Sequence, residues 1–338
     1  MRSISTLALL VSPLISSTLA HYTLSQDYTG KAFYDGFEFF TDADPTNGHV
    51  KYVNKETANN TGIAGLITGG AAKDAVYLGM DTANEAPQGR QSLRVQSSKA
   101  FNRGLFIADI AHMPGGVCGT WPAFWLVGPN WPSSGEIDVI EGVNDQTANN
   151  MAMHTGPGVV LAKNASFSGE LVTSDCDINA AGQGKNVGCL IQDKDTATFG
   201  KGFNEIGGGV YATEWNATGI TIWFFPRNAI PADITAGTPK PNATWGTPRA
   251  SFTGAFKVEE HFKDLNIIFD TTLCGDWAGK VWANSSCAAL APTCEEYVTK
   301  NQAAFKESFW AINSLKVYEM MKHKLRTRTG GAVLHAWV

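Results

Sequence analysis

The sequence predicts an all-β protein, with its strands arranged either as two packed sheets or as a barrel. Three observations support this class. The 338 residues include 35 glycines and 11% aromatic residues, which favours turns and stacked side chains over helices. Runs of β-branched and aromatic residues recur along the chain between Gly, Pro and Asn turns. A hydrophobic content of 43%, against 17% charged residues, is enough for a large buried core.

Most of the expected elements are strands. Their ranges are 90–98, 104–113, 121–128, 135–143, 149–156, 219–227, 264–270 and 311–319. One helix is expected near the end of the chain, because Thr293 and Glu296 have the spacing of a capping box in front of CEEYVTKN. The chain has neither an internal repeat nor a Ser/Pro-rich linker, so we expect one domain over residues 21–319.

The two ends of the chain differ from this domain. Arg2 precedes an apolar run at 7–15, and small residues lead to Ala20, which is the pattern of a secretory signal peptide over residues 1–20. The run is shorter than the ~20 residues that a membrane-spanning helix needs. Residues 320–338 form a basic extension without the hydrophobic end of a lipid-anchor signal. We therefore expect a secreted, extracellular protein.

Sequons and cysteines agree with export. Asn-x-Ser/Thr sequons occur at Asn59, Asn164, Asn216, Asn242 and Asn284, and the six cysteines are an even number.

Only one disulfide can be suggested from the cysteine spacing. Cys176 is expected to pair with Cys189, because the polar, Gly-rich loop DINAAGQGKNVG between them would gain ~3 kcal/mol from closure. A zinc site is the alternative for Cys274, Cys287 and Cys294, but their spacing matches no common zinc pattern and an oxidising compartment favours disulfides.

The charge of the chain restricts its partners. The formal net charge is −5, and the body of the chain has no basic run, so neither nucleic acid nor an anionic membrane is an expected partner. A neutral substrate fits better.

The segment GEIDVIEGVN, residues 135–144, carries three carboxylates in an otherwise apolar strand. Glu136 and Asp138 are two residues apart and share one face of a strand. Strict alternation would send Glu141 to the core face, where an unpaired carboxylate is costly to bury. A β-bulge at Val139 and Ile140 would return Glu141 to the face of the other two acids.

Three crowded carboxylates suit glycoside hydrolysis. Retaining enzymes use two carboxyls ~5–5.5 Å apart, one as nucleophile and one as acid. Crowding raises the pKa of one carboxyl, so that it stays protonated while its neighbour is ionised. On this hypothesis Asp138 orients the nucleophile. The alternatives are an acidic edge strand and a divalent-ion site.

Aromatic residues close to these acids favour a sugar-binding site. Trp121, Trp125 and Trp131 all precede Glu136 within a short segment, and sugar rings stack on flat aromatic faces. A Trp in a sheet more often belongs to the core, so we expect only some of them to face the acids. Alternation places Trp121 and Trp125 on the same side of their strand.

The segment GTWPAFWLVGPNWPSSGEIDVIEGVN, residues 119–144, resembles the active-site region of glycoside hydrolase family 16, and most closely its fungal laminarinase-like endo-1,3(4)-β-glucanases. Glu136, Asp138 and Glu141 match the family motif Glu-x-Asp-x-x-Glu. The resemblance continues through residues 45–54, 89–97, 104–125, 274–279 and 310–318, and leaves out 320–338.

The resemblance implies a concanavalin A-like β-sandwich, or jelly roll, of two antiparallel sheets with a concave substrate cleft. It implies a secreted, monomeric, endo-acting retaining enzyme that hydrolyses internal bonds of β-1,3-glucan, mixed β-1,3/1,4-glucan or both, without a cofactor. Glu136 would be the nucleophile, Glu141 the general acid/base and Asp138 an assisting carboxylate. Relatives can carry a structural calcium ion, but no metal site is assigned here. Transglycosylation, or glucan binding without cleavage, is the alternative function.

Further residues are expected to bind substrate. Trp131 and Trp277 match family positions that contact sugar. His154 lies on the strand after the acids and is expected to point into the cleft, although a structural hydrogen bond is the alternative. Arg94 is a candidate for a sugar hydroxyl, with a cross-strand ion pair as the alternative.

Overall fold

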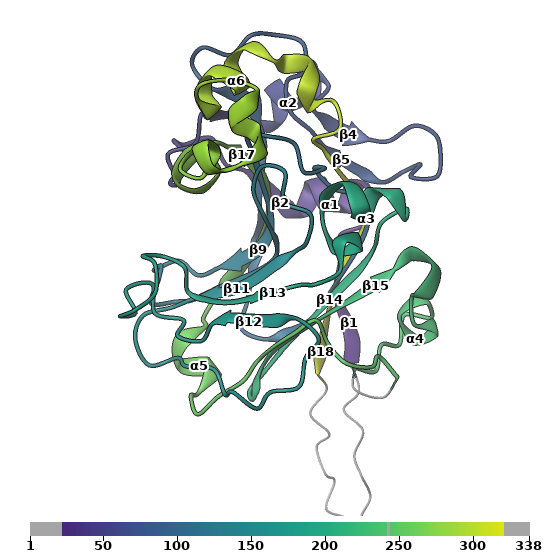
Figure 1. Cartoon of the computed structure of the whole chain (residues 1–338). Coiled ribbons are helices and arrows are strands. Elements are labelled where there is room, and N and C mark those ends of the chain that lie inside the picture. The colour runs from purple at the N-terminus through teal and green to yellow at the C-terminus, as the bar shows by residue number, and fades with distance from the viewer. Residues whose placement is uncertain (1–21, 242–243, 321–338) are drawn as a thin grey trace, which may run out of the picture.

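The computed structural model describes residues 22–241 and 244–320 and consists mainly of two antiparallel sheets packed face to face (Figure 1). The back sheet contains, in order, β16 (Ala250–Phe252), β15 (Gly219–Pro226), β14 (Gly209–Asn216), β8 (Gly104–His112), β18 (Trp310–Met320), β5 (Val76–Leu78) and β4 (Ala64–Leu66), with β1 (Tyr22–Asp27) also paired to β18. The predicted all-β sandwich is confirmed.

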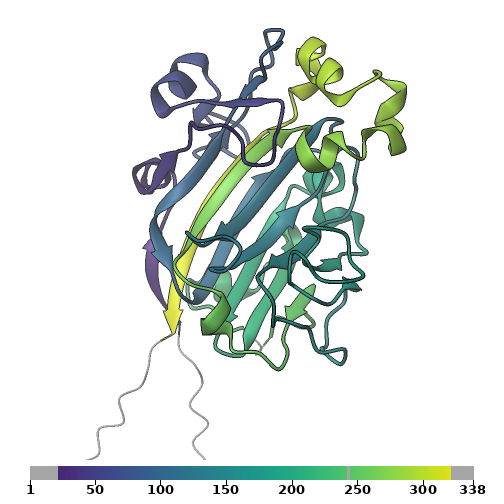
Figure 2. The ribbon, with the colours of Figure 1, turned by 90° about the vertical axis from the view of Figure 1, so that its left-hand side faces the viewer.

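The front sheet carries the acidic segment (Figure 2). It contains, in order, β12 (Glu170–Thr173), β13 (Cys189–Gln192), β11 (Asn150–His154), β10 (Glu136–Glu141), β9 (Thr120–Val127), β17 (Leu265–Leu273), β7 (Arg94–Phe101) and β2 (Phe37–Phe39). A small parallel ribbon joins β3 (Val50–Tyr52) to β6 (Arg90–Ser92). Every strand predicted from the sequence is present, although the segment 90–98 is divided between β6 and β7.

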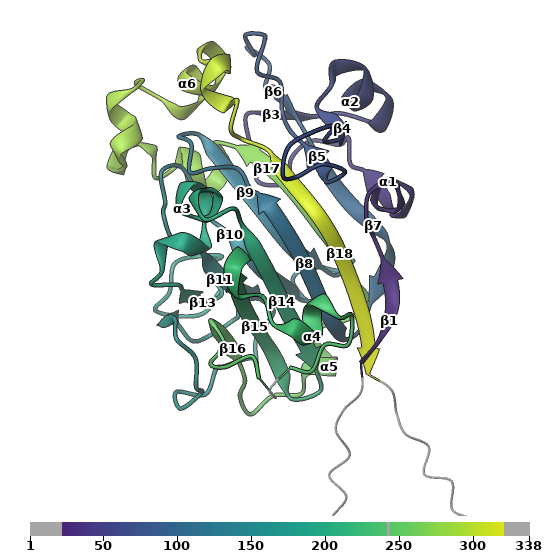
Figure 3. The ribbon, with the colours of Figure 1, turned by 90° about the vertical axis from the view of Figure 1, so that its right-hand side faces the viewer.

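The main core lies between the two sheets. Strand alternation sends Ile137 and Val139 from β10 into this core, where they meet inward residues of the back sheet such as Tyr211, Ile222 and Val317. A second apolar cluster covers the other face of the back sheet, where Trp223 and Trp245 pack edge to face. Figure 3 shows the segment with α4 (Ala232–Thr235) lying over that face.

Helices are short and lie outside the sheets. Besides α4, the α-helices are α1 (Lys31–Gly36), α2 (Lys55–Thr61), α3 (Gly200–Glu205), α5 (Val258–His261) and α6 (Cys294–Lys300). There are also 3-10 turns η1 (Thr196–Thr198), η2 (Arg227–Ala229), η4 (Trp282–Asn284), η5 (Ser286–Ala289) and η6 (Gln302–Phe305) and a π-turn η3 (Gly275–Gly279). The predicted helix is α6, and the Thr293 hydroxyl accepts from the Glu296 backbone N–H at 3.1 Å. No helix in the described part of the chain is long and apolar enough to span a bilayer.

All six cysteines form disulfides. The predicted Cys176–Cys189 pair is confirmed. The zinc alternative is wrong, because Cys274 pairs with Cys294 and Cys287 pairs with Cys118. Cys118–Cys287 attaches η5 to the start of β9, and Cys274–Cys294 joins the start of η3 to the start of α6. The segment from η3 to α6 contributes to a small apolar cluster of its own.

The remaining predictions for export lie partly outside the described residues. The signal peptide 1–20 and residues 321–338 of the basic extension fall there, and so does Asn242. Asn59, Asn164 and Asn284 are exposed and Asn216 is half-buried.

Candidate active site

β10 contains the predicted bulge. Asp138 pairs with Trp125 on β9, but the next pair is Ile140 with Phe124, so Val139 is an extra residue. Val139 and Ile140 are both fully buried in the core. The bulge therefore returns Glu141 to the face of Asp138, since a bulge shifts the alternation of a strand by one residue.

Glu136, Asp138 and His154 form a close cluster on the outer face of the front sheet. His154 lies opposite Glu136 on β11, and its Nε2 is 3.8 Å from Glu136 Oε1 and 3.2 Å from Asp138 Oδ2. The side chains of Glu136 and Asp138 are 16% and 3% exposed. One ligand atom from each of the three lies within 4.8 Å of the others, so the cluster could hold a divalent cation as well as a shared proton.

The cluster leaves polar atoms for a ligand. Among the described residues, Asp138 Oδ2 and His154 Nδ1 are buried without a hydrogen-bond partner. The contact between Asp138 and His154 has the distance of an ion pair but not the angles of a hydrogen bond. Buried polar groups are nearly always satisfied, so these atoms are available to a substrate or a water molecule.

Burial and mutual repulsion make these carboxyls weak acids. Burial raises the pKa of Glu136 to about 8, and the charge of Asp138 adds to the shift while His154 opposes it. Burial, again with Asp138, raises the pKa of Glu141 to about 8. Burial raises the pKa of Asp138 well above its usual range. Because ionisation of one carboxyl disfavours ionisation of the next, the cluster can offer a carboxylate and a protonated acid at the same pH.

Glu141 is held by an indole. Trp121 Nε1 donates to Glu141 Oε1 at 2.8 Å. Trp277, in η3, packs edge to face against Trp121 with ring centroids 5.5 Å apart. The Cys274–Cys294 disulfide anchors η3, so it also fixes the position of Trp277 beside the acid/base candidate.

Arg94 and Trp125 form a second part of the same face. Trp125 lies directly opposite Asp138, so both point outward, as the alternation of Trp121 and Trp125 predicted. The Arg94 guanidinium lies between the Trp125 ring at 4.9 Å and the Phe40 ring at 4.7 Å. Arg94 lies opposite Asp270 on β17, and its charge opposes the burial that raises the pKa of Asp270 to about 7. Among the described residues no carboxylate oxygen lies within 4.0 Å of the Arg94 guanidinium, so this cross-strand interaction is longer than a direct ion pair.

Trp131 is the most exposed of the candidate aromatic residues. Its side chain is 43% exposed in the turn between β9 and β10, at the Glu136 end of β10, and a cis peptide joins it to Pro132. An exposed indole in the turn that leads into β10 is free to stack on a sugar ring.

Sequence reasoning missed two asparagines near the site. Asn144 accepts from the Gly119 N–H at 2.8 Å and donates to the Ala278 carbonyl at 2.9 Å, which connects β9 to η3. Asn149 bonds to the backbone of the bulge, accepting from the Glu141 N–H at 2.9 Å. In the sequence Asn144 ends the acidic segment and Asn149 begins the strand predicted over 149–156, and neither position has a pattern that indicates these hydrogen bonds.

The raised pKa of Glu141 predicts how its replacement changes stability. An unfolded chain releases this proton near pH 4.5, but the folded protein keeps it to about pH 8. The free energy of unfolding therefore falls as the pH rises through this window. Glu141→Gln does not titrate and still accepts from Trp121. Urea unfolding should find it more stable than the parent by at least about 1 kcal/mol at pH 8, with no difference below pH 4.5.

The exposed Glu85 offers the control for this experiment. Glu85→Gln makes the same replacement on the surface and should leave the free energy of unfolding within about 0.5 kcal/mol of the parent. A constant difference between Glu141→Gln and the parent at every pH would contradict the prediction.

The arrangement agrees with comparisons to known proteins. A family model described as the XgeA-like, catalytic GH16 domain matches residues 37–318. An endo-1,3(4)-beta-glucanase of Arthroderma benhamiae is 44% identical over 92% of this chain and 68% of its own length. The chain spans about half the length of several other curated relatives.

Two solved structures share the fold. An elongating GH family 16 beta-1,3-glucosyltransferase is 41% identical, with a TM-score of 0.80 over 88% of this chain and 100% of its own. The GH16 Laminarinase 16A from Phanerochaete chrysosporium, with beta-glucans in both donor and acceptor sites, is 38% identical, with a TM-score of 0.81 over 89% of this chain and 100% of its own. The chain therefore belongs to glycoside hydrolase family 16, in its XgeA-like branch.

Proposed function

We propose that this protein is a secreted, endo-acting, retaining β-glucanase that hydrolyses internal bonds of β-1,3-glucan, mixed β-1,3/1,4-glucan or both. The observation that carries the proposal is the bulge in β10, which brings Glu136, Asp138 and Glu141 to one face beside Trp121. The glucanase and laminarinase names of its relatives support this substrate class. We further propose that residues 21–319 form the single catalytic domain after residues 1–20 are removed, and that the enzyme acts as a monomer.

The first chemical step joins the sugar to the protein. The Glu136 carboxylate attacks the anomeric carbon, and the Glu141 carboxylic acid gives its proton to the leaving glycosidic oxygen as the C–O bond breaks. The product is a glycosyl ester of Glu136. Asp138 and His154 flank Glu136, where they orient it for attack and for its departure in the second step.

The second step releases the sugar. Glu141, now a carboxylate, takes a proton from water, and the water oxygen attacks the anomeric carbon. The ester bond breaks and Glu136 leaves as a carboxylate. Two inversions at one carbon give net retention. All the acids and bases come from the protein, so the mechanism needs no cofactor.

The test is to incubate the protein from culture medium with laminarin and with lichenan. New reducing ends and a rapid loss of viscosity are expected from at least one of them, because endo cleavage shortens chains early. The first product should have the anomeric configuration of the substrate by proton NMR. The absence of new reducing ends from both glucans, or an inverted product, would refute the proposal.

Transglycosylation is the second candidate, and the structural likeness to an elongating β-1,3-glucosyltransferase favours it. The same ester of Glu136 can pass its sugar to a hydroxyl of another glucan instead of to water. Products longer than a starting laminari-oligosaccharide would establish this activity. A glucan-binding protein without catalysis is disfavoured, because binding alone gives no reason to crowd carboxyls.

Trp131 is proposed to contribute to glucan binding. Trp131→Ala should raise KM for laminarin about fivefold and change kcat little, because ring stacking contributes ~1 kcal/mol to binding. Leu24→Ala is the matched control, since Leu24 is 51% exposed on β1 of the back sheet. An unchanged KM in Trp131→Ala would show that this indole does not contact the substrate.

A further inference from the structure

Asn149 fills the gap that the bulge opens between β10 and β11. This residue precedes β11 and is fully buried. Its Oδ1 accepts from the Glu141 N–H at 2.9 Å, and its Nδ2 donates to the Val139 carbonyl at 2.8 Å. A bulge disrupts the regular ladder, and an amide side chain can replace a peptide group in both of these bonds.

The backbone of Asn149 is held in turn by the loop after β13. Its N–H donates to Thr198 Oγ1 at 3.2 Å, and its carbonyl accepts from the Asp193 N–H at 2.8 Å. The Thr198 hydroxyl donates to the Asp195 carbonyl at 2.6 Å. The two residues that bond to the Asn149 backbone, Asp193 and Thr198, therefore lie in one short loop.

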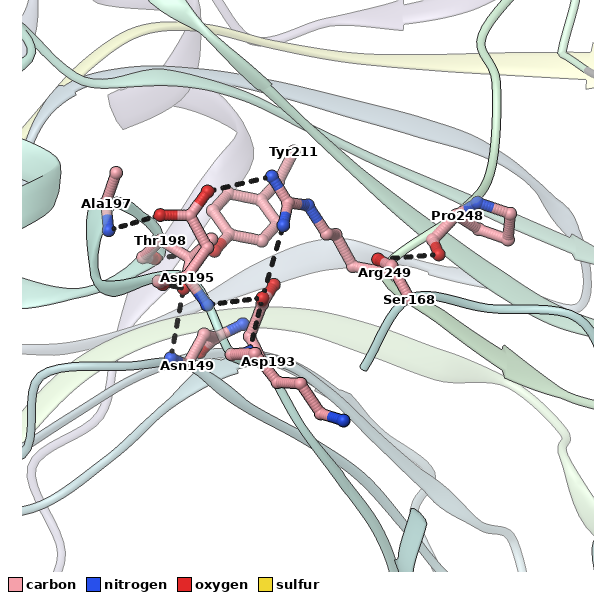
Figure 4. A network of polar contacts seen from close by, with 10 residues as sticks. Asn149, Ser168, Asp193, Asp195, Ala197, Thr198, Tyr211, Pro248 and Arg249 are labelled. Carbon is pink, nitrogen blue, oxygen red and sulfur yellow. Dashed lines mark hydrogen bonds and ion pairs between the residues drawn. The ribbon is translucent and has the colours of Figure 1, made fainter. Parts of the chain in front are cut away.

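The back sheet reaches this loop through two side chains (Figure 4). Arg249, just before β16, contacts Asp193 at 3.3 Å and Asp195 at 3.1 Å. Tyr211, on β14, donates to the Thr198 carbonyl at 2.6 Å. A continuous set of polar contacts thus runs from the back sheet to the backbone of residue 141.

These contacts differ from ordinary packing because they end at the backbone N–H of Glu141. Glu141 is fixed at two places, its N–H by Asn149 and its carboxyl by Trp121. A shift of the N–H would rotate the backbone at residue 141 and swing the carboxyl, because the side chain direction follows the backbone. A general acid must lie within hydrogen-bond reach of the leaving oxygen, so small displacements matter.

We propose that Asn149 is a positioning residue for Glu141, and that Arg249 holds Asn149 in place from the back sheet. This inference rests on the proposed role of Glu141 as the general acid. It assigns Asn149 no contact with the substrate.

The test compares two substrates that differ in their need for an acid. Laminarin has a poor leaving group that must be protonated, whereas a 2,4-dinitrophenyl β-laminaribioside leaves without a proton. For Asn149→Ala, kcat/KM on laminarin should fall about 100-fold, the cost of a misplaced catalytic group. On the aryl substrate kcat/KM should stay close to the parent, because this parameter reports only the first step.

Asn204→Ala is the matched control. Asn204 makes the same pair of bonds to one backbone residue elsewhere, accepting from the Met113 N–H at 3.0 Å and donating to the Met113 carbonyl at 2.9 Å. Asn204→Ala should leave the ratio of kcat/KM on laminarin to kcat/KM on the aryl substrate the same as in the parent. Asn149→Asp keeps the acceptor for the Glu141 N–H but loses the donor to the Val139 carbonyl, so its kcat/KM ratio should lie between those of the parent and Asn149→Ala. It takes the place of Asn149→Ala if that variant does not fold.

Arg249→Met should lower the ratio of kcat/KM on laminarin to kcat/KM on the aryl substrate, by a smaller factor than Asn149→Ala does. Arg227→Met is its control, because Arg227 makes a similar half-buried ion pair with Asp109 at 2.7 Å. An Arg249→Met ratio equal to that of Arg227→Met would remove Arg249 from the proposal.

Glu141→Gln in the same assay distinguishes a failure of the positioning role of Asn149 from a failure of the general-acid role of Glu141. If it loses activity on laminarin but not on the aryl substrate, while both Asn149 variants lose activity equally on both or lose none, the positioning role is wrong and the acid assignment stands. If Glu141→Gln shows no difference between the substrates, the acid assignment fails and the positioning role fails with it.

Discussion

Glu136→Gln should lower kcat/KM on laminarin by on the order of 1,000-fold or more, because an amide cannot form the glycosyl ester. The substitution keeps the shape of a side chain that is only 16% exposed. It also removes a group whose pKa is raised by burial, so the variant should be as stable as the parent or more so at neutral pH. Glucan binding should therefore survive, and calorimetric titration with laminari-oligosaccharides should measure it.

Glu170→Gln is the control for this experiment. Glu170 lies on β12 at the edge of the same sheet and is exposed. It should keep full activity. A Glu136→Gln enzyme that retains a tenth of the parent activity would refute the nucleophile assignment, because no other carboxyl in the proposed mechanism can form the glycosyl ester.

The bulge could be predicted because electrostatics leave few alternatives. A regular strand would bury Glu141 in the core, and the cost of burying an unpaired carboxylate makes an irregular strand the better solution. The structure places Val139 and Ile140 in the core and Glu141 beside Trp121. Local chemistry in one strand was enough for this part of the site.

Other parts of the site depend on residues far apart in the sequence. Arg94 was expected to meet a sugar hydroxyl or an opposite charge, but its position between Phe40, which follows β2, and Trp125, on β9, depends on residues far from it in the sequence. Whether it also contacts sugar stays a prediction. Asn149 bonds to backbone groups that the bulge leaves without their regular strand partners, so no sequence pattern distinguishes it from other asparagines.

The same distinction applies to the fold. Strand β14 lies between β8 and β15 but was not predicted, since both of its faces are covered and Val210 and Tyr211 show no alternation of burial. The three-residue strands β4 and β5 exist because a longer neighbour pairs with them. The Cys176–Cys189 bond closes a short loop and could be predicted, whereas Cys118–Cys287 spans 169 residues and could not.

Glu141→Ala should lower kcat/KM on laminarin by roughly 100- to 10,000-fold, the usual contribution of a general acid. An aryl glucoside with a good leaving group should still form the ester of Glu136, but its hydrolysis should then be slow because no base activates water. A burst of phenolate followed by slow turnover is the expected time course, and stopped-flow absorbance measures it.

Sodium azide gives the sharper result. Azide is a nucleophile that needs no base, so it should speed turnover of the aryl substrate by Glu141→Ala and yield a β-glycosyl azide by attack on the ester of Glu136. In Glu136→Ala the ester cannot form, and azide would instead displace the leaving group directly to give the α-glycosyl azide. Proton NMR of the two products therefore assigns both carboxyls. An α-azide from Glu141→Ala would reverse the roles of Glu136 and Glu141, because only the residue that forms the ester determines from which face azide attacks.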